Sequence, residues 1–167
     1  MTIYQGRVWK FGDDIDTDVI IPVRYCGGTD IQVLGRHCME GLYPDFFTKV
    51  RSGDIMVAGK NFGCGSSREP AALAIKVAGI TCVIARSFAR IFYRNAFNVG
   101  LPLIDCDQID SIDEGDEIKV NLDTGQIDNL TTGRVLLAKP IPSFMQNLIR
   151  DGGLINHISK RLNLRRD

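Results

Sequence analysis

The 167-residue sequence predicts an α/β fold with a parallel or mixed sheet core flanked by helices, followed by an antiparallel β section. An apolar run at 55–58 precedes one helical segment and a second run at 82–85 precedes another, which is typical of a parallel sheet. Turn-forming residues at 113–116 and 123–125 separate short strand patterns and indicate the antiparallel section. The length predicts a single domain over 1–167.

The first elements follow from apolar spacing and from residues that break it. Residues 6–11 alternate as in a strand, and the Gly-Asp-Asp sequence at 12–14 ends it. A helix is expected over 31–41, with Ile31, Leu34, Cys38 and Met39 on one side. Helices are also expected over 68–78 and 87–99, each after a core strand.

The second half of the chain has a different pattern. Strands are expected over 117–121 and 126–130. Pro142 is expected to open a helix that the Gly-Gly pair at 152–153 ends.

The segment 154–167 forms a basic C-terminal tail, which we interpret as a solvated or interface helix. Its histidine, His157, has no partner cluster in the sequence and is interpreted as structural or exposed. The basic residues of the tail are Lys160, Arg161, Arg165 and Arg166.

The charge balance narrows the function. Twenty basic and twenty acidic residues cancel, so no global field favours nucleic acid or an anionic membrane surface. No apolar run approaches the roughly 20 residues of a membrane span, and the polar start lacks a signal-peptide core. We therefore expect a cytoplasmic protein.

Cysteine usage argues against a metal site within this chain. The five cysteines are widely spaced without a Cys-x-x-Cys pair, and the chain has only two histidines. Cys82 and Cys106 lie in apolar surroundings and are expected in the core. Backbone amides around Cys64 could lower its pKa, but no histidine base is nearby, so a catalytic Cys64 is not favoured.

The segment GKNFGCGSSREP at 59–70 carries the strongest functional signal. Its glycines, Gly65 among them, permit positive φ and a close approach to a ligand. The N–H groups of the helix that follows, together with Arg68, favour a carboxylate or phosphate. A hydroxyl among these positive groups ionises more easily, which makes Ser66 or Ser67 a candidate base or nucleophile.

Plainer readings remain open beside this anion site. The Gly-Ser run could be a simple turn with a serine cap. A nucleotide phosphate loop is disfavoured because the helix entry at 65–68 is Gly-Ser-Ser-Arg and Lys60 precedes the glycines. The aspartates at 13–18 lack the glycine and distal glutamate of a calcium loop. The Arg and aromatic mixture at 89–95 is interpreted as core plus a polar edge rather than an RNA-stacking surface.

Three motifs resemble one family: GDDIDTDVIIP at 12–22, GKNFGCGSSRE at 59–69 and ARSFARIFYRNAFNVGLPLI at 85–104. Together they resemble the small subunits of 3-isopropylmalate dehydratase, the detached swivel domain of the aconitase superfamily. The resemblance implies a swivelling β/β/α domain and a hydro-lyase of leucine biosynthesis. It also implies a heterodimer with a large subunit whose four-iron four-sulfur cluster completes the site. This chain would bind no cofactor itself.

The resemblance also assigns roles to site residues. Ser66 would be the base that removes a proton from a hydroxy-dicarboxylate substrate, and Arg68 would stabilise that serine and a substrate carboxylate. Gly65 and Ser67 would lie at the substrate. Asp18 would orient a partner group, although a plain turn-capping role is open.

A loop at 24–29 matches the segment of the family that faces the variable side chain of the substrate. Its two glycines leave room but no apolar wall for an isopropyl group. The substrate is therefore open among isopropylmalate, 2,3-dimethylmalate, citramalate and homoaconitate, and a non-enzymatic anion-binding module is the alternative from another class. The candidate substrate-binding residues of this loop are Arg24, Tyr25, Cys26, Gly27 and Gly28.

Overall fold

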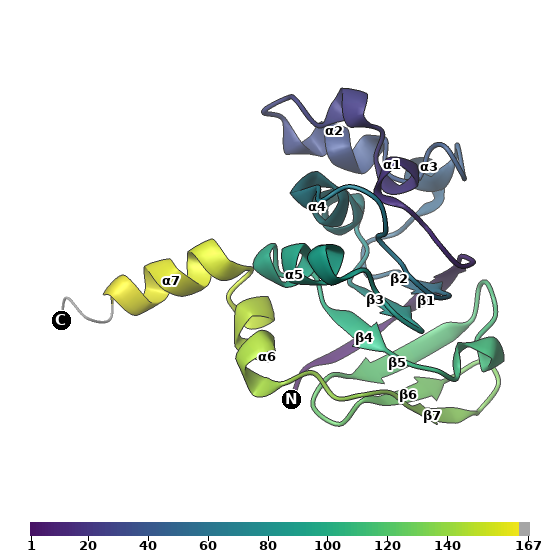
Figure 1. The fold of residues 1–167 in the computed structure, drawn as a ribbon. Helices are drawn as coiled ribbons and strands as arrows, with labels where there is room; N and C mark the ends of the chain where they lie inside the picture. Colours follow the sequence, from purple (N-terminus) through teal and green to yellow (C-terminus); the bar gives the residue numbers. More distant parts are fainter. Residues whose placement is uncertain (164–167) are drawn as a thin grey trace.

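The computed structural model describes residues 1–163, in which seven strands form one sheet in the order β4-β3-β2-β1-β5-β6-β7 (Figure 1). Strands β1 to β4 pair in parallel, whereas β5, β6 and β7 pair antiparallel and join the sheet through β1. The mixed sheet with an antiparallel C-terminal section is thus confirmed. The strands are β1 (Ile3–Lys10), β2 (Ile55–Ala58), β3 (Cys82–Ala85), β4 (Leu103–Asp105), β5 (Glu117–Asn121), β6 (Gln126–Asn129) and β7 (Val135–Leu137).

Helices α2 and α4 pack against each other, and α5 packs against α4. Figure 1 shows this helical layer on one side of the molecule and β5, β6 and β7 on the other. The helices are α1 (Thr17–Ile20), α2 (Ile31–Arg36), α3 (Phe46–Lys49), α4 (Glu69–Ala78), α5 (Arg90–Asn98), α6 (Ser143–Arg150) and α7 (Leu154–Asn163).

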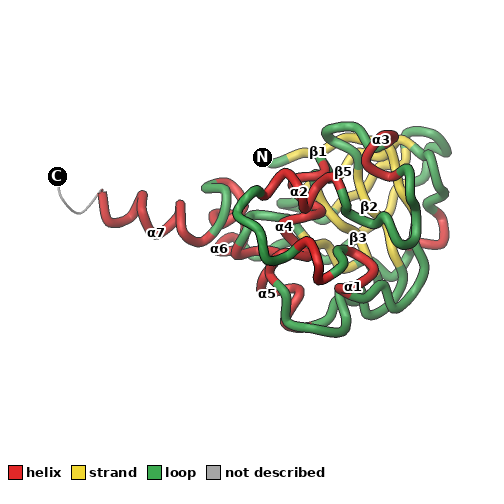
Figure 2. Tube along the Cα trace, turned by 90° about the horizontal axis from the view of Figure 1, so that it is seen from above, coloured by secondary structure: helices red, strands yellow, loops and turns green. Residues whose placement is uncertain are grey.

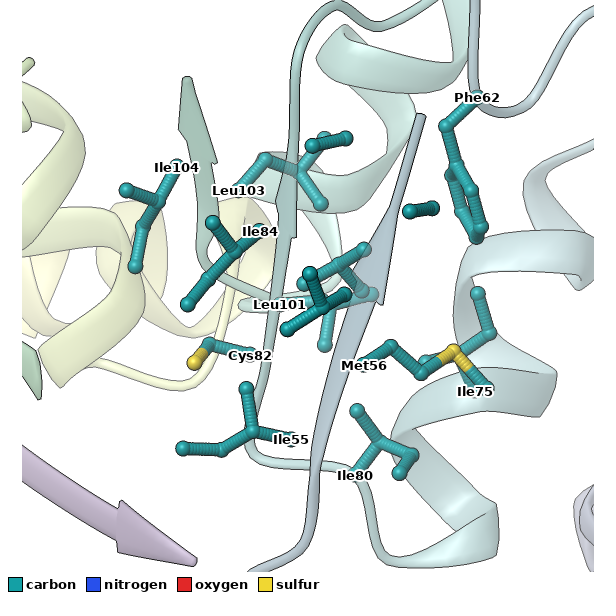
Figure 3. Packing of buried hydrophobic residues seen from close by; sticks show 14 of the residues in the cluster. Ile55, Met56, Phe62, Ile75, Ile80, Cys82, Ile84, Leu101, Leu103 and Ile104 are labelled. Atoms are coloured by element: carbon teal, nitrogen blue, oxygen red, sulfur yellow. The ribbon is translucent and has the colours of Figure 1, made fainter. Parts of the chain in front are cut away.

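The core lies around the parallel strands. Every residue of β2 and β3 is buried, as expected for strands covered on both faces. Met56 of β2 points toward Ile75 of α4, and Ile80 lies beside them (Figure 3). Four buried alanines allow α4 to lie close to its neighbours: Ala71, Ala72, Ala74 and Ala78.

Two predicted boundaries in the first third are wrong. The first strand begins at Ile3 rather than residue 6, because residues 3–5 pair with β5, a partner that local pattern does not reveal. The helix predicted over 31–41 ends at Arg36, and the chain then turns through Met39, whose φ is 61°. Ile31 is 48% exposed, so it does not share the buried side of that segment.

The start of α5 also differs from the prediction. The helix begins at Arg90 rather than residue 87, because the preceding residues pair with Phe62 of the glycine loop. The N–H of Phe62 donates to the carbonyl of Ser87 (3.0 Å), and the N–H of Ala89 donates to that of Phe62 (2.9 Å). Ile91 is 48% exposed and does not share the buried face of Phe92.

The C-terminal helix extends away from the rest of the molecule (Figures 1 and 2). Its exposed positions include Ile155, which is 80% exposed. His157 lies against Asp151, with Nδ1 2.7 Å from Oδ2, and is thus a structural histidine. Arg165 and Arg166, predicted as part of the basic tail, lie outside the described residues. In residues 1–163, no helix is both long and apolar enough to cross a membrane.

Asp151 provides a pH-dependent attachment for α7. Hydrogen bonds from Lys160 and His157 hold the pKa of Asp151 below its usual value. A carboxyl with a depressed folded-state pKa stabilises the fold above its unfolded pKa, and that contribution is lost as pH falls through the folded pKa. We therefore expect the protection of the α7 amides, measured relative to intrinsic exchange at the same pH, to fall below about pH 4. Mass-spectrometric exchange checks this, and Asp151→Asn should show low protection at every pH. Identical pH profiles for the two proteins would contradict the assignment.

Candidate active site

Parallel strands bring three loops together at their carboxyl ends, the usual ligand position in open α/β sheets. These are the acidic loop (residues 12–18) after β1, the glycine loop (59–68) after β2, and residues 86–89 after β3. Backbone hydrogen bonds join the first two loops: Asp14 N to Lys60 O (2.8 Å), Gly63 N to Ile15 O (2.7 Å) and Thr17 N to Cys64 O (2.8 Å). The candidate site is therefore built on paired backbone.

Most carboxylates of the acidic loop accept hydrogen bonds, and those of Asp13 and Asp14 join this loop to the glycine loop. The bonds are Lys60 N to Asp13 Oδ1 (2.7 Å), Asn61 Nδ2 to Asp14 Oδ1 (3.0 Å) and Val19 N to Asp16 Oδ1 (2.9 Å). Asp16 is the N-cap of α1. Within residues 1–163, no group of three or more histidine, cysteine, aspartate or glutamate side chains is arranged to bind a metal ion.

Arg68 is the centre of the candidate site. Its Nη1 donates to Oδ1 of Asp18, and its Nη2 lies 3.4 Å from Oγ of Ser66. The Arg68 side chain is 25% exposed and that of Asp18 is 67% exposed, so the pair lies at the surface with other guanidinium donors still available. The structure thus brings together three residues predicted from separate parts of the sequence.

Ser66 and Ser67, between which residue chemistry left the choice open and the resemblance favoured Ser66, differ in their surroundings. Both serines are exposed. The Ser66 hydroxyl faces the Arg68 guanidinium, and its backbone N–H donates to Oγ1 of Thr17 (3.1 Å). Among the described residues the Ser67 hydroxyl makes no hydrogen bond to another side chain. This geometry favours Ser66 as the activated hydroxyl.

Thr17 is a site residue that sequence reasoning missed. The residue is only 2% exposed, and its hydroxyl accepts a hydrogen bond from the Ser66 N–H. A buried hydroxyl needs such a partner, and the bond fixes the backbone of the serine. The available signal was that Thr17 is the only uncharged polar residue in the sequence DIDTD at 14–18.

The positive φ expected in the glycine loop is confirmed. Gly63 has φ 81° and Gly65 has φ 99°, conformations that favour glycine. A Cβ at Gly65 would lie 3.3 Å from Oγ1 of Thr17, whereas one at Gly63 would lie 2.1 Å from the Phe92 ring. Gly63 therefore allows the loop to pass directly over an aromatic side chain of α5.

Replacing Gly63 with alanine is expected to lower the free energy of unfolding by about 2 to 4 kcal/mol, from backbone strain plus overlap with Phe92. Urea denaturation of the isolated chain measures this. Gly41→Ala is the control, because a Cβ at Gly41 meets no atom within 4 Å. Equal unfolding midpoints for the two variants would contradict this account of the loop.

One electrostatic expectation for the loop is wrong. Burial and the carboxylates of Asp16 and Asp14 raise the pKa of Cys64 and outweigh the lowering by a backbone hydrogen bond. Pro70 occupies the first turn of α4 and has no N–H. Cys38 and Cys82 are buried, which raises their pKa values strongly, and the expected core positions of Cys82 and Cys106 are confirmed.

The candidate residues of the 24–29 loop form a second group. Arg24 is paired with Glu40, its Nη2 lying 2.8 Å from Oε1, and Tyr25 stacks on His37. Gly27 and Gly28 are exposed, with open space where a Cβ would be. Within residues 1–163, no hydrogen bond or ion pair joins this loop to Ser66, Arg68 or Asp18.

Comparisons with known proteins agree with this architecture. A family model described as the aconitase C-terminal domain matches residues 34–108. The "3-isopropylmalate dehydratase small subunit" of Heliobacterium modesticaldum is 57% identical over 160 residues, which cover 95% of this chain and 96% of that protein. The "isopropylmalate/citramalate isomerase small subunit" of Methanocaldococcus jannaschii is 57% identical over 162 residues, covering 96% of each.

A solved structure extends the likeness to the fold. The crystal structure titled 3-isopropylmalate dehydratase from Methanocaldococcus jannaschii superposes with a TM-score of 0.94 at 46% identity, covering 98% of both chains. The residues matched by the aconitase C-terminal domain model contain the glycine loop and strands β2, β3 and β4, so this part of the chain resembles such a domain. The chain belongs to the family of 3-isopropylmalate dehydratase small subunits.

Proposed function

We propose that this chain is the small subunit of a hydro-lyase that interconverts 2-isopropylmalate and 3-isopropylmalate by dehydration and rehydration. The observation that carries the proposal is the contact of Arg68 with both Asp18 and the Ser66 hydroxyl, in a chain more than half identical to proteins of that name. In this scheme one domain over 1–167 works in the cytoplasm with a large subunit.

Ser66 is the proposed general base. A proton beside a carboxylate is weakly acidic, so its removal requires a strong base and stabilisation of the developing negative charge. The guanidinium of Arg68 lies 3.4 Å from the Ser66 oxygen and favours its ionised form. Arg68 then has donors left for a substrate carboxylate, while Asp18 orients the guanidinium and Gly65 and Ser67 line the substrate position.

Loss of the substrate hydroxyl is assigned to the partner subunit. The proposed large subunit carries a four-iron four-sulfur cluster, which supplies the Lewis acid for the departing hydroxyl. Ser66 and Ser67 are exposed in the chain alone, which fits a site that a second subunit closes over. The isolated small subunit is therefore expected to be inactive.

Citramalate is the second candidate substrate, because a relative at 57% identity is named an isopropylmalate/citramalate isomerase small subunit. Dimethylmalate and homoaconitate are more distant alternatives within the family, and an anion-binding module without catalysis is the non-enzymatic alternative. The open space around Gly27 and Gly28 is compatible with substituents of different size.

The test is anaerobic co-expression with the candidate large subunit, reconstitution of the cluster, and parallel assays of 3-isopropylmalate, citramalate, dimethylmalate and homocitrate. Selective turnover of isopropylmalate supports the proposal. Preference for citramalate or dimethylmalate moves the protein to a sister activity. Absence of turnover in an assembled, cluster-loaded complex contradicts the catalytic assignment, and tight dicarboxylate binding by the isolated chain would support the anion-binding module.

A further inference from the structure

Four side chains form a connected group, called here the Arg24–Glu40 cluster: Arg24, Tyr25, His37 and Glu40. The two oxygens of Glu40 bridge the group, with Oε1 2.8 Å from Nη2 of Arg24 and Oε2 2.6 Å from Nδ1 of His37. The rings of Tyr25 and His37 stack with centroids 3.8 Å apart and planes within 5°. The guanidinium of Arg24 lies over the Tyr25 ring, 4.6 Å from its centroid. Each member thus contacts at least two others.

The cluster connects the 24–29 loop, which contains two glycines, to the segment that carries His37 and Glu40. His37 is the C-cap of α2, and its N–H donates to the carbonyl of Val33 (3.2 Å). Met39, between His37 and Glu40, is fully buried and its N–H donates to the carbonyl of Ile20 (2.8 Å). The side of the cluster formed by His37 and Glu40 is therefore fixed to the core.

The side of the cluster formed by Arg24 and Tyr25 leads into a segment with few side-chain contacts. Gly27 and Gly28 follow Tyr25 and have no side chain to pack, so ordering them carries a large entropy cost. The position of this segment therefore depends on the residues before it. Arg24 and Tyr25 are those residues, and their side chains meet Glu40 and His37.

Glu40 is suited to this role. Its side chain is 23% exposed, against 66% for Arg24, so the carboxylate lies on the protected side of the pair. Burial opposes its charged form, but hydrogen bonding from His37 and the charge of Arg24 hold the pKa of Glu40 below its usual value. An isolated exposed ion pair contributes little, whereas a bridged group of four restricts two side chains at once.

We infer that Glu40 and His37 are positioning residues for substrate selection: they orient Arg24 and Tyr25 and so place the Cys26–Gly27–Gly28 segment beside the variable group of the substrate. This inference rests on the proposed function. A second consequence is that a substrate carboxylate competes with Glu40 for Arg24, so Glu40 sets how readily Arg24 contacts the substrate.

The test uses Glu40→Gln, which removes the charge, and His37→Phe, which keeps the aromatic stack and loses the bond to Glu40. Lys49→Gln is the matched control, because it breaks the comparable exposed pair of Lys49 with Asp45 (3.5 Å) outside the cluster. All variants are assayed as assembled, cluster-loaded complexes with 3-isopropylmalate and citramalate.

Glu40→Gln is expected to change KM by about three- to tenfold, to a different extent for the two substrates, with kcat changed by less than about twofold. His37→Phe is expected to have a smaller effect, since the stack remains. Lys49→Gln is expected to match the wild type. A merely structural role would instead lower the yield of complex or kcat equally for both substrates, and that result would overturn the inference.

Hydrogen exchange of the isolated chain gives a readout that does not need turnover. The amides of Tyr25 and Cys26 donate within the loop, to Pro22 O (3.1 Å) and Val23 O (3.0 Å). Their exchange should accelerate at least about threefold in Glu40→Gln and stay unchanged in Lys49→Gln. Unchanged exchange in Glu40→Gln overturns the inference. If the wild-type complex is nevertheless active, the proposed function stands. A wild-type complex inactive on every substrate defeats the proposed function, and the selectivity role with it.

Discussion

Replacing Ser66 with alanine is expected to lower kcat of the assembled complex by about 10³-fold, the range for loss of a positioned general base. KM is expected to stay within about threefold, because the alanine variant keeps the backbone N–H that donates to Thr17 and leaves Arg68 in place. Steady-state kinetics of the anaerobically reconstituted complex measure both constants.

Ser67→Ala is the matched control for this substitution. Ser67 is the next residue and is also exposed, but within residues 1–163 its hydroxyl makes no hydrogen bond to Arg68. We expect its kcat to fall by less than about tenfold. If Ser67→Ala were the inactive variant and Ser66→Ala retained turnover, the base would be assigned to the wrong serine. Size-exclusion chromatography confirms that both variants assemble.

Replacing Arg68 with lysine is expected to reduce kcat/KM by about 10² to 10³-fold, although the positive charge is kept. The planar guanidinium contacts Asp18 through one nitrogen and faces Ser66 with another. A lysine ammonium is a single point charge that cannot reproduce this fork while also binding a substrate carboxylate. Both kcat and KM are therefore expected to change, because the same side chain serves the base and the substrate.

Asp18→Asn tests whether Asp18 acts by orienting the Arg68 guanidinium or through its negative charge. Asparagine keeps an acceptor for Arg68 but removes the negative charge, so we expect a smaller loss than for Arg68→Lys, about tenfold in kcat/KM. A loss as large as that of Arg68→Lys would show that Asp18 does more than orient the guanidinium. Wild-type activity for Arg68→Lys would contradict the role of the guanidinium itself.

The sequence predicted the order of the core elements because their signals are local. Apolar runs of four residues followed by helical spacing marked β2 with α4 and β3 with α5, and the turn sequences marked β5 and β6. The ends of these elements were less accessible. Residues 87–89 have helical spacing, but their backbone pairs with Phe62, which is remote in the sequence. These hydrogen bonds override the local preference for helix.

The candidate site was predicted in part. The composition of the glycine loop indicated positive φ, a hydroxyl and an arginine, and the structure has these features together. The partner of Arg68 and the support of Ser66 came from the acidic loop, where composition did not distinguish the aspartates and only the family resemblance pointed to Asp18. Thr17 was missed, because its importance depends on its burial beside Ser66.

The sequence by itself determined which segments form the parallel core and which residues are candidates for chemistry, because residue type and hydrophobic periodicity can be recognised within short segments. Only the tertiary structure decided that Asp18 pairs with Arg68, that Arg68 donates to the Ser66 hydroxyl, and that Glu40 and His37 contact Arg24 and Tyr25 of the 24–29 loop. The Asp18–Arg68 contact arises because parallel strands end at one edge of the sheet, so loops distant in sequence meet there. The local sequence pattern of each loop does not predict which remote loop it will contact.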